Sequence, residues 1–129
     1  MAKILIIEDN EQNLYLEAFI LKKDGHEIIQ AHNGETGIAL AAQALPALIL
    51  LDIQLPGMDG YTVARELRKN PAIANIPIIA VTSYAMTGDR ERILEAGCAG
   101  YIEKPINPDT FHAEIAQYLG GGSTIHPAG

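Results

Sequence analysis

The chain has 129 residues, which fits one domain of ordinary size and leaves no room for two. Sixteen Asp and Glu against nine Lys and Arg give a net charge of -7, which argues against a protein that binds nucleic acid by neutralising phosphates. The hydrophobic share is 48%, which is typical of a globular protein, and no apolar run is long enough to cross a membrane. The sequence also has no signal-peptide cleavage site, and its single cysteine, Cys98, cannot form an internal disulfide. These features predict a soluble, cytoplasmic protein.

Five short apolar runs alternate with longer amphipathic stretches along the chain. The runs predict strands at residues 4–7, 26–31, 48–51, 76–81 and 100–102. Most of them are near-continuous in Ile, Leu and Val, which is typical of strands buried on both faces of a parallel sheet. The second run is the most polar, and this favours a position at the edge of the sheet.

The stretches between the runs follow a helical period and predict helices with one apolar face. In chain order the apolar side chains are Leu14, Ala18 and Leu21 with Tyr15 and Phe19 beside them, then Ile38, Ala41, Ala42 and Leu45, then Tyr61, Ala64 and Leu67, and near the C-terminus Phe111, Ile115, Tyr118 and Leu119. A helix predicted over residues 89–96 is the most polar, with only Ile93, Leu94 and Ala96 to bury. Such weak anchoring makes it a candidate for an element that moves.

This alternation of strand and helix, repeated five times, predicts an α/β fold. Turn-forming residues fall between the elements, and right-handed crossovers favour a doubly wound, five-stranded parallel sheet of the flavodoxin-like order 2-1-3-4-5. We expect residues 1–119 to form this one domain. The Gly-rich residues 120–129 are expected to be a flexible tail.

Polar side chains gather at the carboxyl ends of the predicted strands, where doubly wound sheets bind ligands. Glu8 and Asp9 follow the first strand and Asp52 follows the third. Thr82 follows the fourth strand and Lys104 the fifth. Three carboxylates in one place need a compensating cation, and oxygen ligands of this kind suit Mg²⁺. A carboxylate beside Mg²⁺ and a lysine is a plausible nucleophile toward phosphorus, which would give an aspartyl phosphate.

Each of these residues taken alone has an ordinary structural reading. Asp52 can be a solvated loop acid, Thr82 a β-branched strand residue and Lys104 a surface lysine. The functional interpretation is therefore supported by their occurrence together and not by any one of them. Cys98 is best explained as a small buried side chain, and Asp59 as a helix cap. The four histidines lack metal-ligand spacing, and no Gly-rich phosphate-binding motif occurs.

Four motifs resemble, in the right order, the receiver domain of two-component response regulators in the CheY-like superfamily. They are Glu8-Asp9-Asn10, Asp52 within LLDIQLPGMDG, Val81-Thr82-Ser83 and Glu103-Lys104-Pro105. The resemblance covers residues 3–119. Residues 84–98 are further similar to the stand-alone, DivK-like branch and to the receivers of hybrid kinases.

The resemblance implies that Asp52 is phosphorylated by a phosphohistidine on a histidine kinase or a histidine phosphotransfer protein. Asp9 and Asp52 would then ligate Mg²⁺ directly, with the backbone carbonyl of Gln54 as the third protein ligand. Glu8 would act mainly through a metal-bound water. Lys104 would pair with a phosphoryl oxygen, and the peptide bond before Pro105 would be cis.

The resemblance also implies a switch. Thr82 would move toward the phosphoryl group and let Tyr101 turn inward, which changes the surface of the fourth helix, fifth strand and fifth helix for a downstream protein. Gln54 and Tyr84 each lie two residues beyond a site residue, and in this family such side chains tune the lifetime of the phosphorylated form. Because Gln54 is uncharged and Tyr84 is bulky, we expect slow self-dephosphorylation.

Two other functional classes fit less well. A phosphatase with an Asp nucleophile would be expected to have an acid where Gln54 stands and an insertion for a substrate cap, and a flavodoxin-like electron carrier would need a phosphate loop. We therefore expect a single-domain response regulator, monomeric or weakly dimeric, that catalyses only its own phosphorylation and dephosphorylation. A receiver excised from a hybrid histidine kinase or longer regulator is the alternative, although the start at Met1 close to the first strand favours a free-standing protein.

Overall fold

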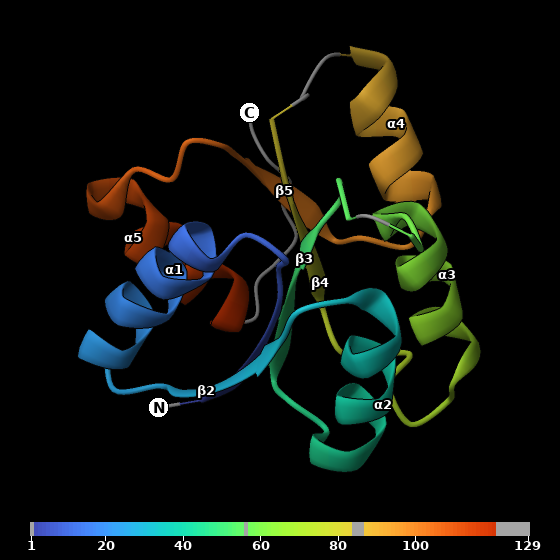
Figure 1. Cartoon of the computed structure of the whole chain (residues 1–129), viewed down its shortest axis with the longest axis horizontal. Coiled ribbons are helices and arrows are strands. Elements are labelled where there is room, and N and C mark those ends of the chain that lie inside the picture. Colours follow the sequence, from blue (N-terminus) through green and yellow to red (C-terminus); the bar gives the residue numbers. More distant parts are fainter. Residues whose placement is uncertain (1, 56, 84–86, 121–129) are drawn as a thin grey trace.

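The protein is a five-stranded parallel sheet between two layers of helices (Figure 1). The computed structural model describes residues 2–55, 57–83 and 87–120. The elements are, in chain order, β1 (Lys3–Ile7), α1 (Glu11–Lys23), β2 (Glu27–Ala31), α2 (Gly34–Ala44), β3 (Leu48–Asp52), α3 (Gly60–Lys69), β4 (Ile78–Thr82), α4 (Thr87–Glu95), β5 (Gly100–Glu103) and α5 (Pro108–Leu119). The strand order β2-β1-β3-β4-β5 confirms the predicted fold and the edge position of β2.

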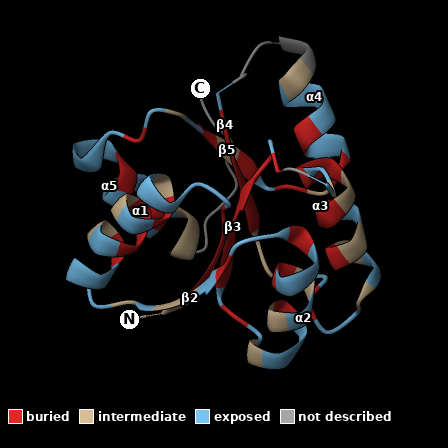
Figure 2. Cartoon of the chain, in the orientation of Figure 1, coloured by how far each residue is buried: buried red, intermediate tan, exposed pale blue. Residues whose placement is uncertain are grey.

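Alternate side chains of the inner strands enter two separate hydrophobic cores. In β1, Ile4 and Ile6 pack with α1 and α5, whereas Leu5 and Ile7 pack in the core on the side of α2, α3 and α4. Figure 2 shows the result, a buried central sheet with helices that are buried only on their inner sides. Because a strand side chain points to one face or the other in turn, burial on both faces explains the unbroken apolar runs.

Polar caps fix the start of four helices. Each cap side chain accepts a hydrogen bond from a backbone N–H of the first turn, which satisfies one of the donors that a helix leaves unpaired there. The pairs are Asn10 with Asn13, Asn33 with Thr36, Asp59 with Thr62 and Asn107 with Asp109. The predicted cap at Asp59 is confirmed, and the caps of α1, α2 and α3 order the loops that follow β1, β2 and β3.

The predicted stripe of α1 is wrong at its two aromatic residues. Leu14 and Ala18 are buried, but Tyr15 is 70% exposed and Phe19 is 49% exposed. The two rings stack on each other with centroids 6.1 Å apart, and the Lys23 ammonium lies 5.6 Å from the centroid of the Phe19 ring. One residue along a helix is a turn of about 100°, so these rings point away from the sheet.

The other stripes are partly confirmed. In α3 and α5 the buried or half-buried members are Tyr61, Ala64, Leu67, Phe111, Ile115, Tyr118 and Leu119. In α4, Ile93 is buried but Leu94 is 50% exposed, so the helix is anchored even more weakly than predicted. In α2, Ala42 is exposed, and Leu45 caps the helix in a left-handed conformation with φ 47° that takes its side chain off the helical face.

Gly60 allows α3 to begin directly against the end of β3. Its N–H donates to the carbonyl of Ile53 at 3.0 Å. A Cβ atom on Gly60 would lie 2.5 Å from the Cα of Ile53 and 2.9 Å from the carbonyl oxygen of Asp52. Both obstacles are backbone atoms, so they cannot move aside without displacing the end of β3.

We expect Gly60→Ala to destabilise the protein by about 1–3 kcal/mol, because the added methyl group overpacks the backbone of β3. Urea denaturation measures the change in the free energy of unfolding. Gly120→Ala is the matched control, since Gly120 has a right-handed conformation with φ -72° and its nearest obstacle to a Cβ is 3.3 Å away. Equal stabilities for the two variants would contradict the close approach.

Candidate functional site

The carboxyl ends of four strands meet at one edge of the sheet and bring the predicted polar residues together. The register pairs Asp52 at the end of β3 with Val81 in β4, and Thr82 at the end of β4 with Glu103 in β5. One carboxylate oxygen from each of Glu8, Asp9 and Asp52 lies within 4.8 Å of the others. Glu8, Asp52 and Thr82 are buried, whereas Asp9 is exposed.

Lys104 supplies positive charge to this acidic cluster. Its Nζ atom lies 3.2 Å from Asp52 Oδ1 and 3.5 Å from Glu8 Oε1. Its backbone N–H donates to the carbonyl of Thr82 at 2.8 Å, so the start of the loop after β5 is held to the end of β4. The peptide bond between Lys104 and Pro105 is cis.

The electrostatics of the cluster follow from burial and from the shared ammonium. Burial, and to a smaller extent the neighbouring Asp52, raises the pKa of Glu8 to about 7, against the opposing effect of Lys104. Burial alone would lower the pKa of Lys104. The carboxylates of Asp52, Glu8 and Glu17 outweigh this effect, and the pKa of Lys104 is raised.

The donor set fits a hard divalent cation such as Mg²⁺. Among the described residues, Glu8 Oε1 is buried and has no hydrogen-bond partner, although the Lys104 ammonium is close to it. The backbone N–H of Gln54 donates to Asp52 Oδ1 at 3.0 Å and that of Asn10 to Glu8 Oε2 at 3.2 Å, which orients both carboxylates. Carboxylate oxygens with room for retained water are the ligands that Mg²⁺ prefers.

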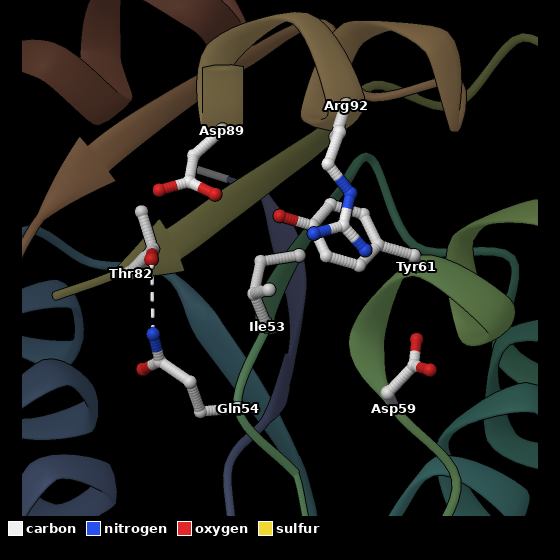
Figure 3. Close-up of a pocket in the computed structure, with 7 residues that line it drawn as sticks. All are labelled: Ile53, Gln54, Asp59, Tyr61, Thr82, Asp89 and Arg92. Carbon is white, nitrogen blue, oxygen red and sulfur yellow. Dashed lines mark hydrogen bonds between the residues drawn. The ribbon is translucent and has the colours of Figure 1, made fainter. Parts of the chain in front are cut away.

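A cavity of about 220 Å³ adjoins the acidic cluster on the side of α3 and α4 (Figure 3). Its lining consists of Ile53, Gln54, Asp59, Tyr61, Thr82, Asp89 and Arg92. The Arg92 guanidinium lies 4.3 Å from the centroid of the Tyr61 ring, which connects α4 to α3. Two of the lining residues are hydrogen-bonded to each other, since the Gln54 Nε2 amide donates to Thr82 Oγ1 at 3.1 Å.

The predicted switch residue Tyr101 lies outside the acidic cluster. Tyr101 on β5 is half-buried and packs against the core on the α4 side. The Arg90 guanidinium lies 5.8 Å from the centroid of its ring. Tyr84 lies outside the described residues.

Glu17 is a buried acid that the sequence analysis missed. It is 1% exposed and lies on the inner face of α1, and its Oε2 atom has no hydrogen-bond partner in the described part of the chain. Burial is the main reason that the pKa of Glu17 is raised to about 8, and the charge of Glu8 adds to it. Its spacing could have indicated its burial, because Glu17 follows Leu14 by three positions and precedes Leu21 by four, which places it on the same helix face as these two residues.

Two expectations from composition bear on the function. Across residues 2–55, 57–83 and 87–120, no helix has the length and apolar character needed to cross a membrane. Cys98 is buried, and burial raises the pKa of its thiol to about 12, as expected for a small interior side chain rather than a reactive thiol.

Comparison with known proteins identifies similar sequences over almost the whole chain. The family model for the response regulator receiver domain matches residues 4–116. The polar-differentiation response regulator DivK of Brucella anthropi is 44% identical over 117 residues, which covers 91% of this chain and 95% of that protein. DivK of Brucella ovis is 43% identical over the same shares of the two chains.

Solved structures with the same fold include other receiver domains. The receiver domain of a sensor histidine kinase from Pseudomonas aeruginosa has a TM-score of 0.86 and 32% identity, over 93% of this chain and 98% of that chain. That structure has a magnesium ion coordinated in its active-site cleft. A CheY-like receiver domain protein from Methanospirillum hungatei has a TM-score of 0.85 and 31% identity, over 93% and 94% of the two chains.

The buried acid of α1 predicts a pH dependence of stability. A carboxyl whose pKa is raised from 4.5 to about 8 on folding stabilises the protein fully below pH 4.5 and loses that contribution as the pH rises through 8. Glu17→Gln removes the ionisation, so above pH 8 we expect the variant to be about 2–5 kcal/mol more stable than the wild type. Urea denaturation between pH 5 and pH 9 measures this difference, and the exposed Glu91→Gln is the control. Parallel pH profiles for Glu17→Gln and the wild type would contradict the buried carboxyl.

Proposed function

The chain belongs to the family of response regulator receiver domains, and on this premise we propose that Asp52 is the residue that accepts the phosphoryl group. A receiver of this family is a two-component signalling protein and not a conventional enzyme. The observation that carries the assignment is the position of Asp52. Its carboxylate lies 3.2 Å from the Lys104 ammonium, and one of its oxygens lies within 4.8 Å of carboxylate oxygens of Glu8 and Asp9.

Phosphoryl transfer in this site is a displacement at phosphorus. One Asp52 oxygen attacks the phosphorus of a phosphohistidine, and the bond between phosphorus and nitrogen breaks. The electron pair of that bond stays on the imidazole nitrogen of the donor, and the ring takes up one proton from solvent and leaves as neutral imidazole. Lys104 neutralises an oxygen of the phosphoryl group during the transfer, and the Thr82 hydroxyl donates to another.

A bound Mg²⁺ would neutralise the charge that accumulates on the carboxylates and phosphoryl oxygens during transfer. We propose Asp9 and Asp52 as its direct carboxylate ligands and the backbone carbonyl of Gln54 as the third protein ligand. Glu8 contributes mainly through a bound water. The proposal is supported by the three converging carboxylates and by the magnesium ion in the similar receiver from Pseudomonas aeruginosa.

The conformational switch is proposed to use Thr82 and Tyr101. Phosphorylation adds about 1.5 to 2 negative charges at Asp52, and the Thr82 hydroxyl moves toward them. Tyr101 then turns into the space that Thr82 leaves. Because α4 buries few of its described side chains, its position responds to this change, and the surface formed by α4, β5 and α5 is altered for a downstream protein.

The proposed partners are a phosphohistidine donor and a protein that reads the altered surface. The donor is a histidine kinase or a histidine phosphotransfer protein, as for other receivers. Neither nucleic acid nor a membrane is expected as a partner, since the chain has a net charge of -7. We expect a cytoplasmic protein that is monomeric or weakly dimeric.

We propose that residues 1–119 act as a stand-alone receiver, with residues 120–129 as a flexible tail. The similarity to DivK of Brucella anthropi, of which the alignment covers 95%, supports this version. The similarity to a receiver that belongs to a sensor histidine kinase supports the alternative, a receiver from a hybrid kinase or longer regulator.

The phosphorylated form is proposed to decay slowly. Gln54 and Tyr84 lie two positions after Asp52 and Thr82, where side chains shape the approach of water to the phosphoryl group. Gln54 has no charge with which to orient a water molecule strongly, and Tyr84 is large enough to shield the phosphorus.

The phosphorylation site is tested by intact mass after incubation with a small acyl-phosphate donor, with and without Mg²⁺. We expect one Mg²⁺-dependent phosphoryl adduct in the wild type and none in Asp52→Asn, because the substitution removes the proposed acceptor, the carboxylate that lies 3.2 Å from the Lys104 ammonium. The control is Asp59→Asn, which changes an exposed acid of the adjoining cavity and keeps a residue that can cap α3.

An adduct that persists in Asp52→Asn would show that the phosphorylation site is wrong. If the small donor leaves the wild type unmodified, transfer from a phosphohistidine protein replaces it. Failure of that transfer as well would contradict the proposed function.

A further inference from the structure

The Gln54 side chain makes a contact that the phosphoryl chemistry does not use. Its amide Nε2 donates to Thr82 Oγ1 at 3.1 Å across 28 positions of the chain (Figure 3). Gln54 is exposed in the loop after β3, whereas Thr82 is buried at the end of β4. The bond therefore connects a surface loop to the residue whose movement is proposed to start the switch.

Gln54 is held in place for this contact by its own backbone. The backbone N–H of Gln54 donates to Asp52 Oδ1 at 3.0 Å, so the start of the loop is fixed on the residue that is phosphorylated. The distance from Nε2 to Thr82 Oγ1 is an ordinary hydrogen-bond length. One residue thus touches the acceptor carboxylate with its main chain and Thr82 with its side chain.

We propose that Gln54 is a positioning residue that holds Thr82 in its resting orientation and so opposes the switch. The inference rests on the proposed function, in which Thr82 approaches a phosphoryl group on Asp52. In the resting protein the amide donates and Thr82 Oγ1 accepts. When the Thr82 hydroxyl turns toward the phosphoryl oxygens, Oγ1 leaves the amide, and the bond must lengthen or break.

The surroundings allow the amide to be released. The cavity of about 220 Å³ lies beside both side chains, so the Gln54 amide can swing aside without a steric clash. Gln54 is exposed, so water can accept from the freed NH₂ group. Release of the Gln54 amide therefore costs one hydrogen bond and leaves no buried donor unpaired.

A second arrangement makes the opposite prediction. If the Gln54 amide followed Thr82 and donated to the phosphoryl group itself, it would stabilise the switched form. Removing the amide would then weaken binding of a phosphoryl mimic. If Gln54 opposes the switch, removing the amide strengthens that binding, so the sign of the change distinguishes the two.

The test uses Gln54→Met, which keeps the length of the side chain and the backbone carbonyl but removes the donor. The probe is beryllium fluoride with Mg²⁺, which mimics a phosphoryl group on an aspartate, and its affinity is measured by calorimetry. We expect Gln54→Met to bind beryllium fluoride about two- to tenfold more tightly than the wild type, the range given by one net hydrogen bond. In the absence of beryllium fluoride, the NMR signal of the Thr82 methyl group should move toward its position in the bound protein.

Two controls isolate the bond. Gln43→Met makes the same change at an exposed position of α2 and should leave the affinity unchanged. In a Thr82→Ala background, Gln54→Met should have no further effect, because Oγ1 is absent. Unchanged or weaker binding by Gln54→Met, with normal binding by the wild type, would overturn the positioning role alone. Failure of the wild type to bind beryllium fluoride would overturn the proposed function, and the positioning role with it.

Discussion

The site is built around an imbalance of charge, because two buried carboxylates share one ammonium. Lys104 lies within 3.5 Å of both Glu8 and Asp52, and Asp9 adds a third carboxylate at the exposed side. One ammonium cannot neutralise three acids, so the resting site favours a cation, and it needs one more when a phosphoryl group adds further negative charge. Burial, with a smaller contribution from Asp52, raises the pKa of Glu8, and the surrounding carboxylates raise the pKa of Lys104.

The sheet holds the charged cluster rigidly, whereas α4 beside the cluster is only weakly anchored. The inner strands are buried on both faces, so the ends that carry Asp52 and Thr82 are fixed by two hydrophobic cores. Gly60 holds the loop after β3 tightly against the sheet. In contrast, the described part of α4 buries Ile93, with Ala96 buried directly after the helix, and the adjacent cavity leaves space for movement. In the proposed switch, a local change of charge would move α4 and leave the sheet undisturbed.

The sequence predicted the fold well because its strands carry a strong local signal. Runs of Ile, Leu and Val specify burial on both faces, and this pattern requires no knowledge of which strands become neighbours. Helix faces were predicted less well. The apolar rings of Tyr15 and Phe19 were placed on the inner face of α1 although they stack outside it, and the acid of Glu17 was overlooked although it lies inside. The prediction assigned the inner face of α1 by hydrophobicity, but the positions along the helix place the two aromatic rings outside and the acid inside.

The residue types at the strand ends, and with them the family, could be predicted from the sequence alone, and they are the basis for the chemistry proposed at the site. Motif spacing places Asp9, Asp52 and Lys104 at the ends of strands, and any doubly wound sheet collects those ends at one edge. Which atoms meet there was decided only by the tertiary structure. The contact between Gln54 and Thr82, and the burial of Glu17, depend on strand order, register and helix rotation, which bring distant segments together to within a hydrogen-bond length. Local periodicity encodes the face on which a side chain lies, but not the partner that it meets across the fold.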